Sequence, residues 1–294
     1  MTIQTYNANL LNRFPQESQN LPFRFSEMDA ASYEQFRTII YEKSGISLGT
    51  GKESLVSARI AKRMRTLDLK DYKAYLNHLY YDETGEEIYN LLDVISTNVT
   101  SFFRQPDHLD FLSQVFSQWI EEGRSRFRFW SSACATGEEP YSLAMKLLDA
   151  ADRRRVDIKI LATDISTRVI KEGMQGLYEK EKLKPVPGYY IPQYFQALHG
   201  EGKSFYEIKP FVKEYILFRR LNLSAPPFPM RGPFDAVLCC NVLIYFDDAV
   251  RKRLLENIHR LLKPDGYLFI GYSESIKLLA NNFRMIKPSI YIKE

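Results

Sequence analysis

The sequence predicts an α/β protein in which a small helical domain precedes a doubly wound, mostly parallel sheet. Two observations support this fold class. From about residue 26 to residue 97, every periodic stretch has the spacing of an amphipathic helix. After Pro106, short apolar strands alternate with helices, and this alternation requires the βαβ crossovers of a parallel sheet. A chain of 294 residues is long enough for two domains.

Four helices are expected in the first part, at about residues 32–41, 52–67, 72–80 and 86–95. In the second of them we expect Leu55, Ile60 and Met64 to face inward. Short polar loops join the helices, so a small bundle is predicted. Residues 1–25 are rich in Asn, Gln and Pro, and we expect them to form a disordered tail.

The second part alternates between helices and strands. In chain order we expect a helix at 107–119, a strand in the run RFRFW, a helix at 138–149, a strand at 158–163, a strand at 234–240, a helix at 248–262, a strand at 267–270 and a closing hairpin at 283–292. Between about residues 177 and 220 this pattern breaks. Prolines, glycines and two alternating stretches (204–208 and 215–218) predict a small antiparallel β-subdomain inserted there.

Composition excludes several classes of protein. No run of eighteen apolar residues exists, so nothing is expected to span a bilayer, and the first residues lack the pattern of a secretory signal. Cys134, Cys239 and Cys240 have the spacing of neither a disulfide nor a zinc site, so we expect reduced thiols, no metal and a cytoplasmic location. A net charge of +4 is too small to indicate nucleic acid.

The turn after the first strand of the α/β part is the first candidate site. Ligands of a doubly wound sheet bind beyond the carboxyl ends of its strands. Here the turn contains no G-x-G-x-x-G fingerprint, and the following helix opens with Glu138 and Glu139, which would repel a pyrophosphate. A cationic ligand without phosphate suits this turn, and S-adenosylmethionine is such a ligand. The alternative is that Thr136 and Glu139 form a capping box.

Two further strand ends carry polar residues. Asp164 ends the second strand, where an acid accepts hydrogen bonds from the hydroxyls of a ribose. Its alternative role is to cap the helix that begins near Ser166. Cys240 and Asn241 follow the strand at 234–240 and would line the same crevice. Three polar strand ends at one edge of the sheet predict a cofactor site there.

Several segments together resemble the CheR-type chemotaxis methyltransferases, over about residues 25 to 291. They are TNVTSFFR (97–104), ATGEEPYS (135–142), TDI (163–165), NVLIYF (241–246), LKPDG (262–266) and GYSE (271–274). The resemblance implies a helical receptor-recognition domain at 26–97, a linker at 98–105 that closes over the cofactor, and a class I S-adenosylmethionine methyltransferase domain at 106–294. It also implies that the insertion at about 177–220 is the β-subdomain with which some members dock a receptor tail peptide.

The resemblance also implies roles for single residues. The linker would contribute Asn98, Thr100 and Arg104 to the cofactor site. Glu139 would contact the methionine part of the cofactor, Asp164 would contact its ribose, and Asn222 and Leu223 would lie near its adenine. Cys240 and Asn241 would line the floor of the site, and Tyr245 would lie near the methyl group that is transferred. Two positions depart from the family. Many relatives have an arginine in place of Cys240, and the loop at 198–202 lacks the glycine-rich form associated with tail-peptide binding.

The activity implied is methylation of glutamate side chains on methyl-accepting chemotaxis receptors, giving methyl esters and S-adenosylhomocysteine. A glutamate has a reference pKa of about 4.3, so it is already ionised and needs no general base. This agrees with four scattered histidines, none of them in a triad or at metal-ligand spacing. Arg104 would orient the acceptor carboxylate, and Tyr245 would donate a hydrogen bond at the reacting centre.

The expected partner is the glutamate-rich helical bundle of the receptor's cytoplasmic part, to which a monomeric enzyme would be recruited at membrane receptor arrays. Arg59, Lys62 and Arg63 fall at i, i+3 and i+4 and would form one complementary basic face, although such a face is often merely solvated. A nucleic-acid methyltransferase is disfavoured because residues 241–246 lack the prolines of an N/D-P-P-Y/F box. Methylation of another protein or small molecule, and a binding module without turnover, remain as alternatives.

Overall fold

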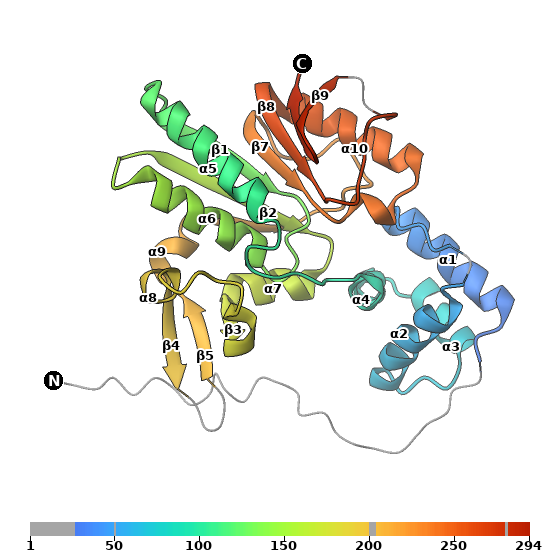
Figure 1. Ribbon diagram of the computed structural model, residues 1–294. Coiled ribbons are helices and arrows are strands. Elements are labelled where there is room, and N and C mark those ends of the chain that lie inside the picture. The colour runs from blue at the N-terminus through green and yellow to red at the C-terminus, as the bar shows by residue number, and fades with distance from the viewer. Residues whose placement is uncertain (1–26, 50, 200–203, 280–281) are drawn as a thin grey trace.

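The computed structural model describes residues 27–49, 51–199, 204–279 and 282–294. A helical bundle lies beside a large twisted sheet that is covered by helices, and a small second sheet projects from the same domain (Figure 1). The predicted tail at 1–25 lies outside the described residues. Within the described parts of the chain, no helix is both long and apolar enough to cross a membrane.

The bundle consists of four helices, close to the predicted ranges: α1 (Ala30–Ser44), α2 (Glu53–Thr66), α3 (Tyr72–Tyr80) and α4 (Glu86–Ile95). The side chain of Asp29 caps α1 by accepting the N–H of Ser32 at 2.8 Å, and Gly45 ends that helix in the left-handed conformation at φ 71°. Ile60 and Met64 are buried as expected. Leu55 is not, because 48% of it is exposed. Val56 takes the inward position instead.

The main sheet has seven strands in the order β6-β2-β1-β7-β8-β10-β9. The first five run parallel and the last two form an antiparallel hairpin at one edge. In chain order the strands are β1 (Arg126–Ser131), β2 (Asp157–Asp164), β6 (Ile216–Arg220), β7 (Phe234–Cys239), β8 (Leu262–Ile270), β9 (Phe283–Lys287) and β10 (Ile290–Lys293). All six residues of β7 are buried: five are apolar, and the sixth, Asp235, pairs with Arg124 and Lys263.

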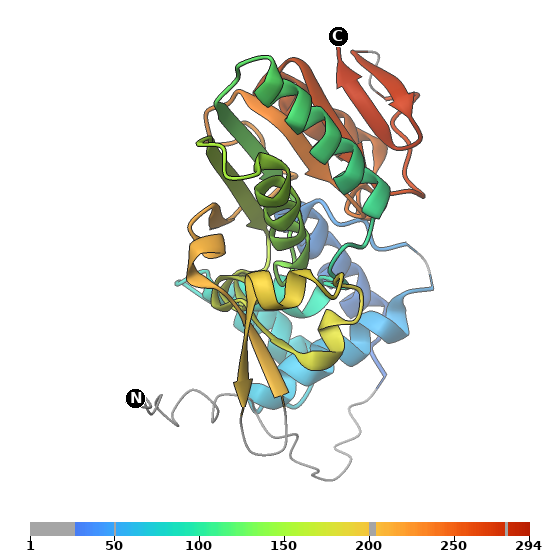
Figure 2. The same cartoon turned by 60° about the vertical axis from the view of Figure 1, so that its left-hand side comes forward.

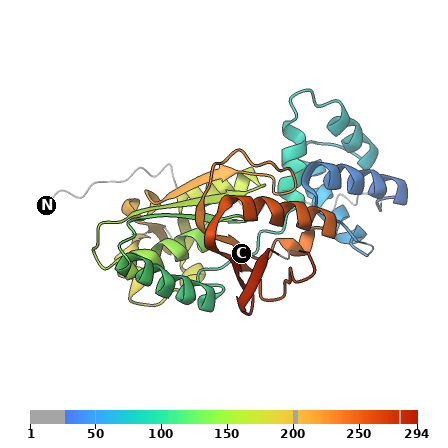
Figure 3. The same ribbon diagram turned by 90° about the horizontal axis from the view of Figure 1, so that it is seen from above.

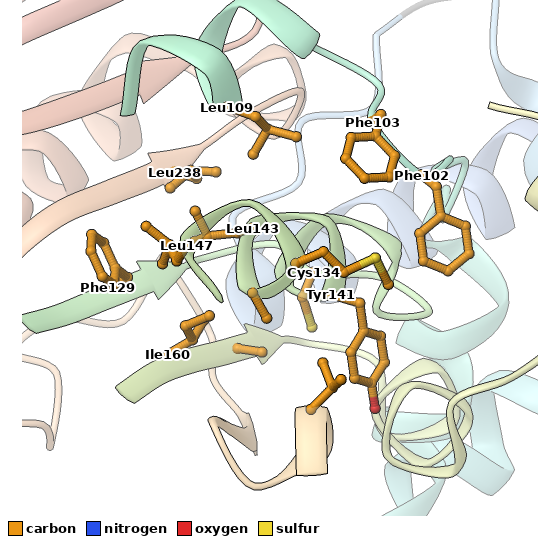
Figure 4. Close-up of a cluster of buried hydrophobic side chains, with 14 of the residues drawn as sticks. Phe102, Phe103, Leu109, Phe129, Cys134, Tyr141, Leu143, Leu147, Ile160 and Leu238 are labelled. Carbon is orange, nitrogen blue, oxygen red and sulfur yellow. The ribbon is translucent and has the colours of Figure 1, made fainter. Parts of the chain in front are cut away.

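Helices cover both faces of this sheet, as in a doubly wound fold (Figures 1 and 3). They are α5 (Pro106–Glu121), α6 (Glu138–Ala151), α7 (Thr167–Gln175) and α10 (Asp248–Leu261). One apolar cluster packs α5 and α6 against the sheet, and Figure 4 shows Leu143 and Leu147 of α6 next to Phe129 and Leu238 of the strands. A second cluster packs α10 against the opposite face.

The small sheet has the antiparallel order β3-β5-β4 and lies apart from the main sheet (Figure 2). Its elements are β3 (Leu177–Glu179), η2 (Lys180–Leu183), α8 (Tyr190–Tyr194), β4 (Phe195–His199), β5 (Ser204–Ile208) and α9 (Pro210–Lys213). The sequence correctly predicted an antiparallel insertion near residue 177. Of the atypical loop at 198–202, residues 200–202 lie outside the described residues.

The predicted end of the insertion, near residue 220, is wrong. Residues 216–220 form β6, which pairs in parallel with β2 and is the edge strand of the main sheet. An edge strand has one partner and is half exposed, so its sequence alternates like that of an antiparallel hairpin. The alternation at 215–218 therefore did not distinguish the two sheets.

The bundle is attached to the sheet domain on one side through α4. Asp93 accepts the N–H groups of Thr167 at 3.0 Å and of Arg168 at 3.2 Å. These belong to the first turn of α7, where N–H groups have no partner within their own helix. Close by, the guanidinium of Arg220 lies 3.8 Å from the ring centre of Tyr89.

A second attachment follows the end of α1. Ser47 donates its N–H to the carbonyl oxygen of Tyr245 at 2.8 Å, and Ile46 forms an isolated antiparallel bridge with Phe246. Tyr245 belongs to the short helix η3 (Leu243–Tyr245), which follows β7. Since β7 and β2 both end here, the two attachments hold the bundle over the carboxyl ends of the parallel strands.

Candidate functional site

A cavity of about 140 Å³ lies where the bundle meets these strand ends. One buried water molecule requires roughly 10–15 Å³ by the same measure, so the cavity has room for about ten water molecules. The bundle, the linker and the turns after β1, β2, β6 and β7 all contribute to its wall. Every residue predicted for the cofactor or the reaction lines it: Asn98, Thr100, Arg104, Glu139, Asp164, Asn222, Leu223, Cys240, Asn241 and Tyr245.

The turn after β1 forms one wall of the cavity. Gly137 has φ 96°, and a Cβ at this position would lie 3.1 Å from the Cα of Gly173 and 3.1 Å from the hydroxyl of Tyr178. Only glycine fits both the conformation and this close approach. The turn places Ser132 at the wall, and its Oγ is buried without a hydrogen-bond partner among the described residues.

Glu139 is partly buried next to this turn. Ser131 donates a hydrogen bond from its Oγ to Oε1 of Glu139 at 2.6 Å. Burial raises the pKa of Glu139 to about 7, although hydrogen bonds from Ser131 and Cys240 and the charge of Arg104 oppose the increase. A partly buried carboxylate at the cavity wall is suited to hold a cationic group, whose charge would favour its ionised form.

The capping box considered for α6 does not form. Gly137 occupies the N-cap position without a side-chain cap, and Thr136 donates to Oε2 of Glu138 at 2.6 Å instead. The other carboxylate oxygen of Glu138 accepts from Lys182 of η2 at 2.7 Å. Glu138 therefore connects α6 to the small subdomain, and Glu139 is left to face the cavity.

Asp164, at the end of β2, fixes the adjoining turns. One carboxylate oxygen accepts the N–H of Ala135 at 2.9 Å, and the other accepts the N–H of Ser166 at 3.0 Å. Burial raises the pKa of Asp164, and the two N–H groups oppose that effect. The cap of α7 is Ser166, whose Oγ accepts the N–H of Val169 at 3.3 Å, so the alternative role of Asp164 as the cap is wrong. Each carboxylate oxygen keeps a lone pair for a ligand hydroxyl.

The floor of the cavity contains Cys240. Its thiol lies 4.0 Å from Nδ1 of His108 and 3.8 Å from the carbonyl oxygen of Phe269. Burial lowers the pKa of His108 to about 4, and its Nε2 lies 2.8 Å from Oγ of Ser289. The imidazole is therefore neutral at pH 7. A second cavity of about 20 Å³ lies between His108, Cys240 and Glu139, in the space behind the floor.

Arg104 and Tyr245 lie on two different segments around the cavity. Arg104 is exposed, and its Nη1 donates to the carbonyl oxygen of Val99 at 2.7 Å. The linker thus folds back on itself and keeps the guanidinium at the cavity wall. Tyr245 is half-buried on η3, and its backbone is held by Ser47.

Asn222 and Leu223 contribute in different ways. Asn222 donates from Nδ2 to the carbonyl oxygen of Lys43 at 2.8 Å, and its Oδ1 accepts the N–H of Ser224 at 3.0 Å. Both of its polar groups are therefore engaged in joining α1 to the turn after β6. Leu223 is buried against the α10 side of the sheet and offers the cavity an apolar surface.

The predicted basic face of α2 requires a correction. Arg63 points toward α4 and donates from Nε to Oε1 of Glu87 at 2.9 Å, which also accepts from the hydroxyl of Tyr75 at 2.7 Å. Arg59 donates to the carbonyl oxygen of Ile95, at the end of α4, and lines the cavity. Of the three predicted residues, Lys62 alone is exposed. The i, i+3, i+4 spacing correctly placed these residues on adjoining positions, but it could not reveal that α4 packs there.

Sequence reasoning missed the cavity residues that come from the bundle. These include Ile46, Leu48, Lys52, Leu55 and Arg59. Leu48 belongs to the core of the bundle, and the others would look ordinary on an isolated bundle. These residues contribute to the cavity only because the bundle docks on the sheet. Within the described residues, no group of three or more His, Cys, Asp or Glu side chains is arranged to hold a metal ion.

Comparison with known proteins agrees with this architecture. Residues 31–96 match the family described as CheR methyltransferase, all-alpha domain, and residues 98–292 match CheR methyltransferase, SAM binding domain. These matches confirm the predicted fold class and the resemblance.

Three curated relatives are each named a chemotaxis protein methyltransferase. The protein from Escherichia coli is 34% identical over 96% of this chain and 98% of its own length. That from Borreliella burgdorferi is 35% identical over 87% and 91%, and one from Pseudomonas aeruginosa is 32% identical over 92% and 95%. The chain therefore belongs to the CheR family of S-adenosylmethionine-dependent methyltransferases.

Proposed function

We propose that this enzyme methylates glutamate carboxylates on methyl-accepting chemotaxis receptors, giving methyl esters and S-adenosylhomocysteine. The observation that carries the proposal is the combination of a guanidinium at the cavity wall with no histidine among the described residues that line it. Such a site can orient an acceptor carboxylate but has no imidazole to remove a proton. An acceptor that is already ionised needs no such group.

The residues of the cavity fit the cofactor. Glu139 would pair with the ammonium of its methionine part, and Asp164 would accept hydrogen bonds from the ribose hydroxyls. The apolar side chain of Leu223 would contact the adenine. When bound, S-adenosylmethionine supplies an electrophilic methyl group on its sulfonium.

Arg104 and Tyr245 would act on the acceptor. The planar guanidinium of Arg104 can hold a carboxylate through two parallel hydrogen bonds. The hydroxyl of Tyr245 would donate a further hydrogen bond and fix the orientation of the attacking oxygen. The docked bundle and the linker would exclude water, whose removal from the carboxylate makes it a stronger nucleophile.

The bundle would recognise the receptor, whose methylated region is a glutamate-rich helical structure. Lys62 supports this role because its ammonium is exposed on α2. We further propose that the enzyme acts as a monomer in the cytoplasm, is recruited to receptor arrays, and requires neither metal nor nucleic acid.

Transfer of label from S-adenosylmethionine to receptor-containing membranes tests the proposal. The wild-type enzyme should label a receptor band, whereas Arg104→Ala should reduce turnover far more than it weakens cofactor binding. Arg104→Lys should recover little, since an ammonium cannot make two parallel hydrogen bonds. Label appearing only in small molecules would favour the alternative substrate class. Cofactor binding without any transfer would favour a binding module.

A further inference from the structure

Glu274, in the loop after β8, accepts three backbone hydrogen bonds. Its Oε2 accepts the N–H of Gly271 at 2.6 Å and that of Asn241 at 2.9 Å. Its Oε1 accepts the N–H of Ile244 at 3.2 Å. Two of these three donors, Asn241 and Ile244, belong to the segment after β7 that contains Cys240 and the short helix η3 with Tyr245. One carboxylate therefore connects the loops that follow two adjacent strands.

The loop after β7 needs such a support. Asn241 has φ 58°, in the left-handed region, which asparagine adopts more readily than other residues with a side chain but at a greater cost than glycine. The chain turns sharply there and enters η3 within two residues. N–H groups aimed at a carboxylate form charge-assisted hydrogen bonds, which are stronger than neutral ones. The bonds to Glu274 therefore favour this conformation over the relaxed alternatives.

Gly271 makes the arrangement possible. A Cβ at this position would lie 2.7 Å from Oε2 of Glu274, 2.8 Å from Nδ2 of Asn241 and 3.0 Å from its backbone N. A Cβ atom essentially never lies within 3.0 Å of a neighbouring atom, so any larger residue would push the carboxylate of Glu274 or the side chain of Asn241 away. The side chains of Glu274 and Asn241 thus fill the space that a side chain at position 271 would need.

We infer that Glu274 is a positioning residue of the cofactor site. It does not line the cavity itself, whereas Cys240, Asn241 and Tyr245 do. By holding the backbone at two points, it fixes where the floor residues lie against the cofactor and where the Tyr245 hydroxyl lies against the acceptor. The expected effect of Glu274 on cofactor binding assumes only that the cofactor is S-adenosylmethionine, as in the rest of the family. The expected effect of Glu274 on the rate of methyl transfer rests on the role proposed above for Tyr245.

Calorimetry with S-adenosylmethionine and S-adenosylhomocysteine tests the first effect. Glu274→Gln keeps the size but loses one acceptor and the charge, while Glu274→Ala loses all three hydrogen bonds. We expect affinity to fall on the order of tenfold to a hundredfold for Ala, as for other displaced site groups, and less for Gln. The exposed neighbour provides a control, because Ser275→Ala should bind normally. Gly271→Ala should weaken binding as the carboxylate substitutions do.

Thermal unfolding of the same variants separates positioning from mere stabilisation. If folded Glu274→Gln and Gly271→Ala melt at lower temperature but bind both nucleosides with wild-type affinity, the inference is wrong. If Glu274→Ala does not fold, these two variants still decide the matter.

A double-mutant cycle tests the second effect. The double variant of Tyr245→Phe and Glu274→Gln should lose less kcat than the product of the two single-variant losses predicts. The reason is that both substitutions act through the Tyr245 hydroxyl. Independent effects on kcat would contradict coupling through Tyr245. If the enzyme proves not to methylate receptors, the result on cofactor binding still stands. The two proposals can therefore fail separately.

Discussion

At the scale of single residues, the site depends on two carboxylates, of which Asp164 is buried and Glu139 partly buried before any ligand arrives. Glu139 is enclosed by β1, the linker and the floor, and burial raises its pKa to about 7. Asp164 is 8% exposed and is held by two backbone N–H groups. Burying such groups costs free energy that a cationic, hydroxyl-bearing ligand can recover. This explains why the two acids suit S-adenosylmethionine and would oppose a phosphate.

The raised pKa of Glu139 predicts a pH dependence of cofactor affinity. An ammonium favours the ionised carboxylate, so binding should lower the pKa of Glu139 in the complex. Below pH 7 the free protein must release a proton in order to bind. Affinity for S-adenosylhomocysteine should therefore fall by up to about tenfold per pH unit from pH 7 toward pH 5.5.

Calorimetry in two buffers of different ionisation enthalpy would measure both the affinity and the proton release. Glu139→Gln should bind more weakly at pH 7 and lose this dependence. A wild-type affinity that stays constant from pH 7 to pH 5.5 would contradict the proposed ammonium pairing.

Asp164 makes a second prediction at this scale. Asp164→Asn replaces one acceptor oxygen by a donor, so it should weaken cofactor binding by about 1–3 kcal/mol. Asp157→Asn is a matched control, because Asp157 begins the same strand at the opposite end and pairs with Arg128. Unchanged cofactor affinity in a folded Asp164→Asn protein would remove Asp164 from the site.

At the scale of elements, a buried charge cluster holds the bundle together. Glu87 of α4 accepts from Arg63 of α2 and from Tyr75 of α3. Burial alone would raise the pKa of Glu87, but these hydrogen bonds outweigh it and the pKa is lowered. The carboxylate therefore stabilises the bundle above the ordinary pKa of a glutamate and loses that effect as the pH falls below it.

Arg63→Ala should destabilise the protein by about 3 kcal/mol, because it leaves Glu87 buried without its cation. Lys62→Ala, one residue earlier on the exposed side, should change stability by less than about 0.5 kcal/mol. Denaturant unfolding measures both values. If Arg63→Ala is as stable as Lys62→Ala, the pair with Glu87 does not support the fold and the solvated basic face returns as the better interpretation.

Elements also show what periodicity can predict. The helices of the bundle and the alternating strands were predictable because amphipathic spacing and continuous apolar runs follow directly from burial. The assignment of β6 was wrong because a parallel edge strand and a small antiparallel hairpin share the same half-buried pattern. Local sequence contains no signal for which strand lies next to β2.

At the scale of the whole molecule, the site exists because the bundle docks over the strand ends. The ten predicted cavity residues could be identified from the sequence because they lie at strand ends or in segments shared with the family. Lys52, Leu55 and Arg59 could not, since their place in the cavity wall follows from the attachments through Asp93 and Ser47. The positioning role inferred for Glu274 likewise required the approach of two loops that are 30 residues apart.

The central claim is that the acceptor is a receptor carboxylate, and the chemical stability of the product tests it most directly. Receptor-containing membranes would be labelled with methyl-labelled S-adenosylmethionine, separated from free cofactor and treated with mild alkali. A carboxyl methyl ester is a good electrophile, so the label should leave the receptor band as volatile methanol. Label that remains on the receptor through this treatment would mean N- or ether-methylation and would contradict the account.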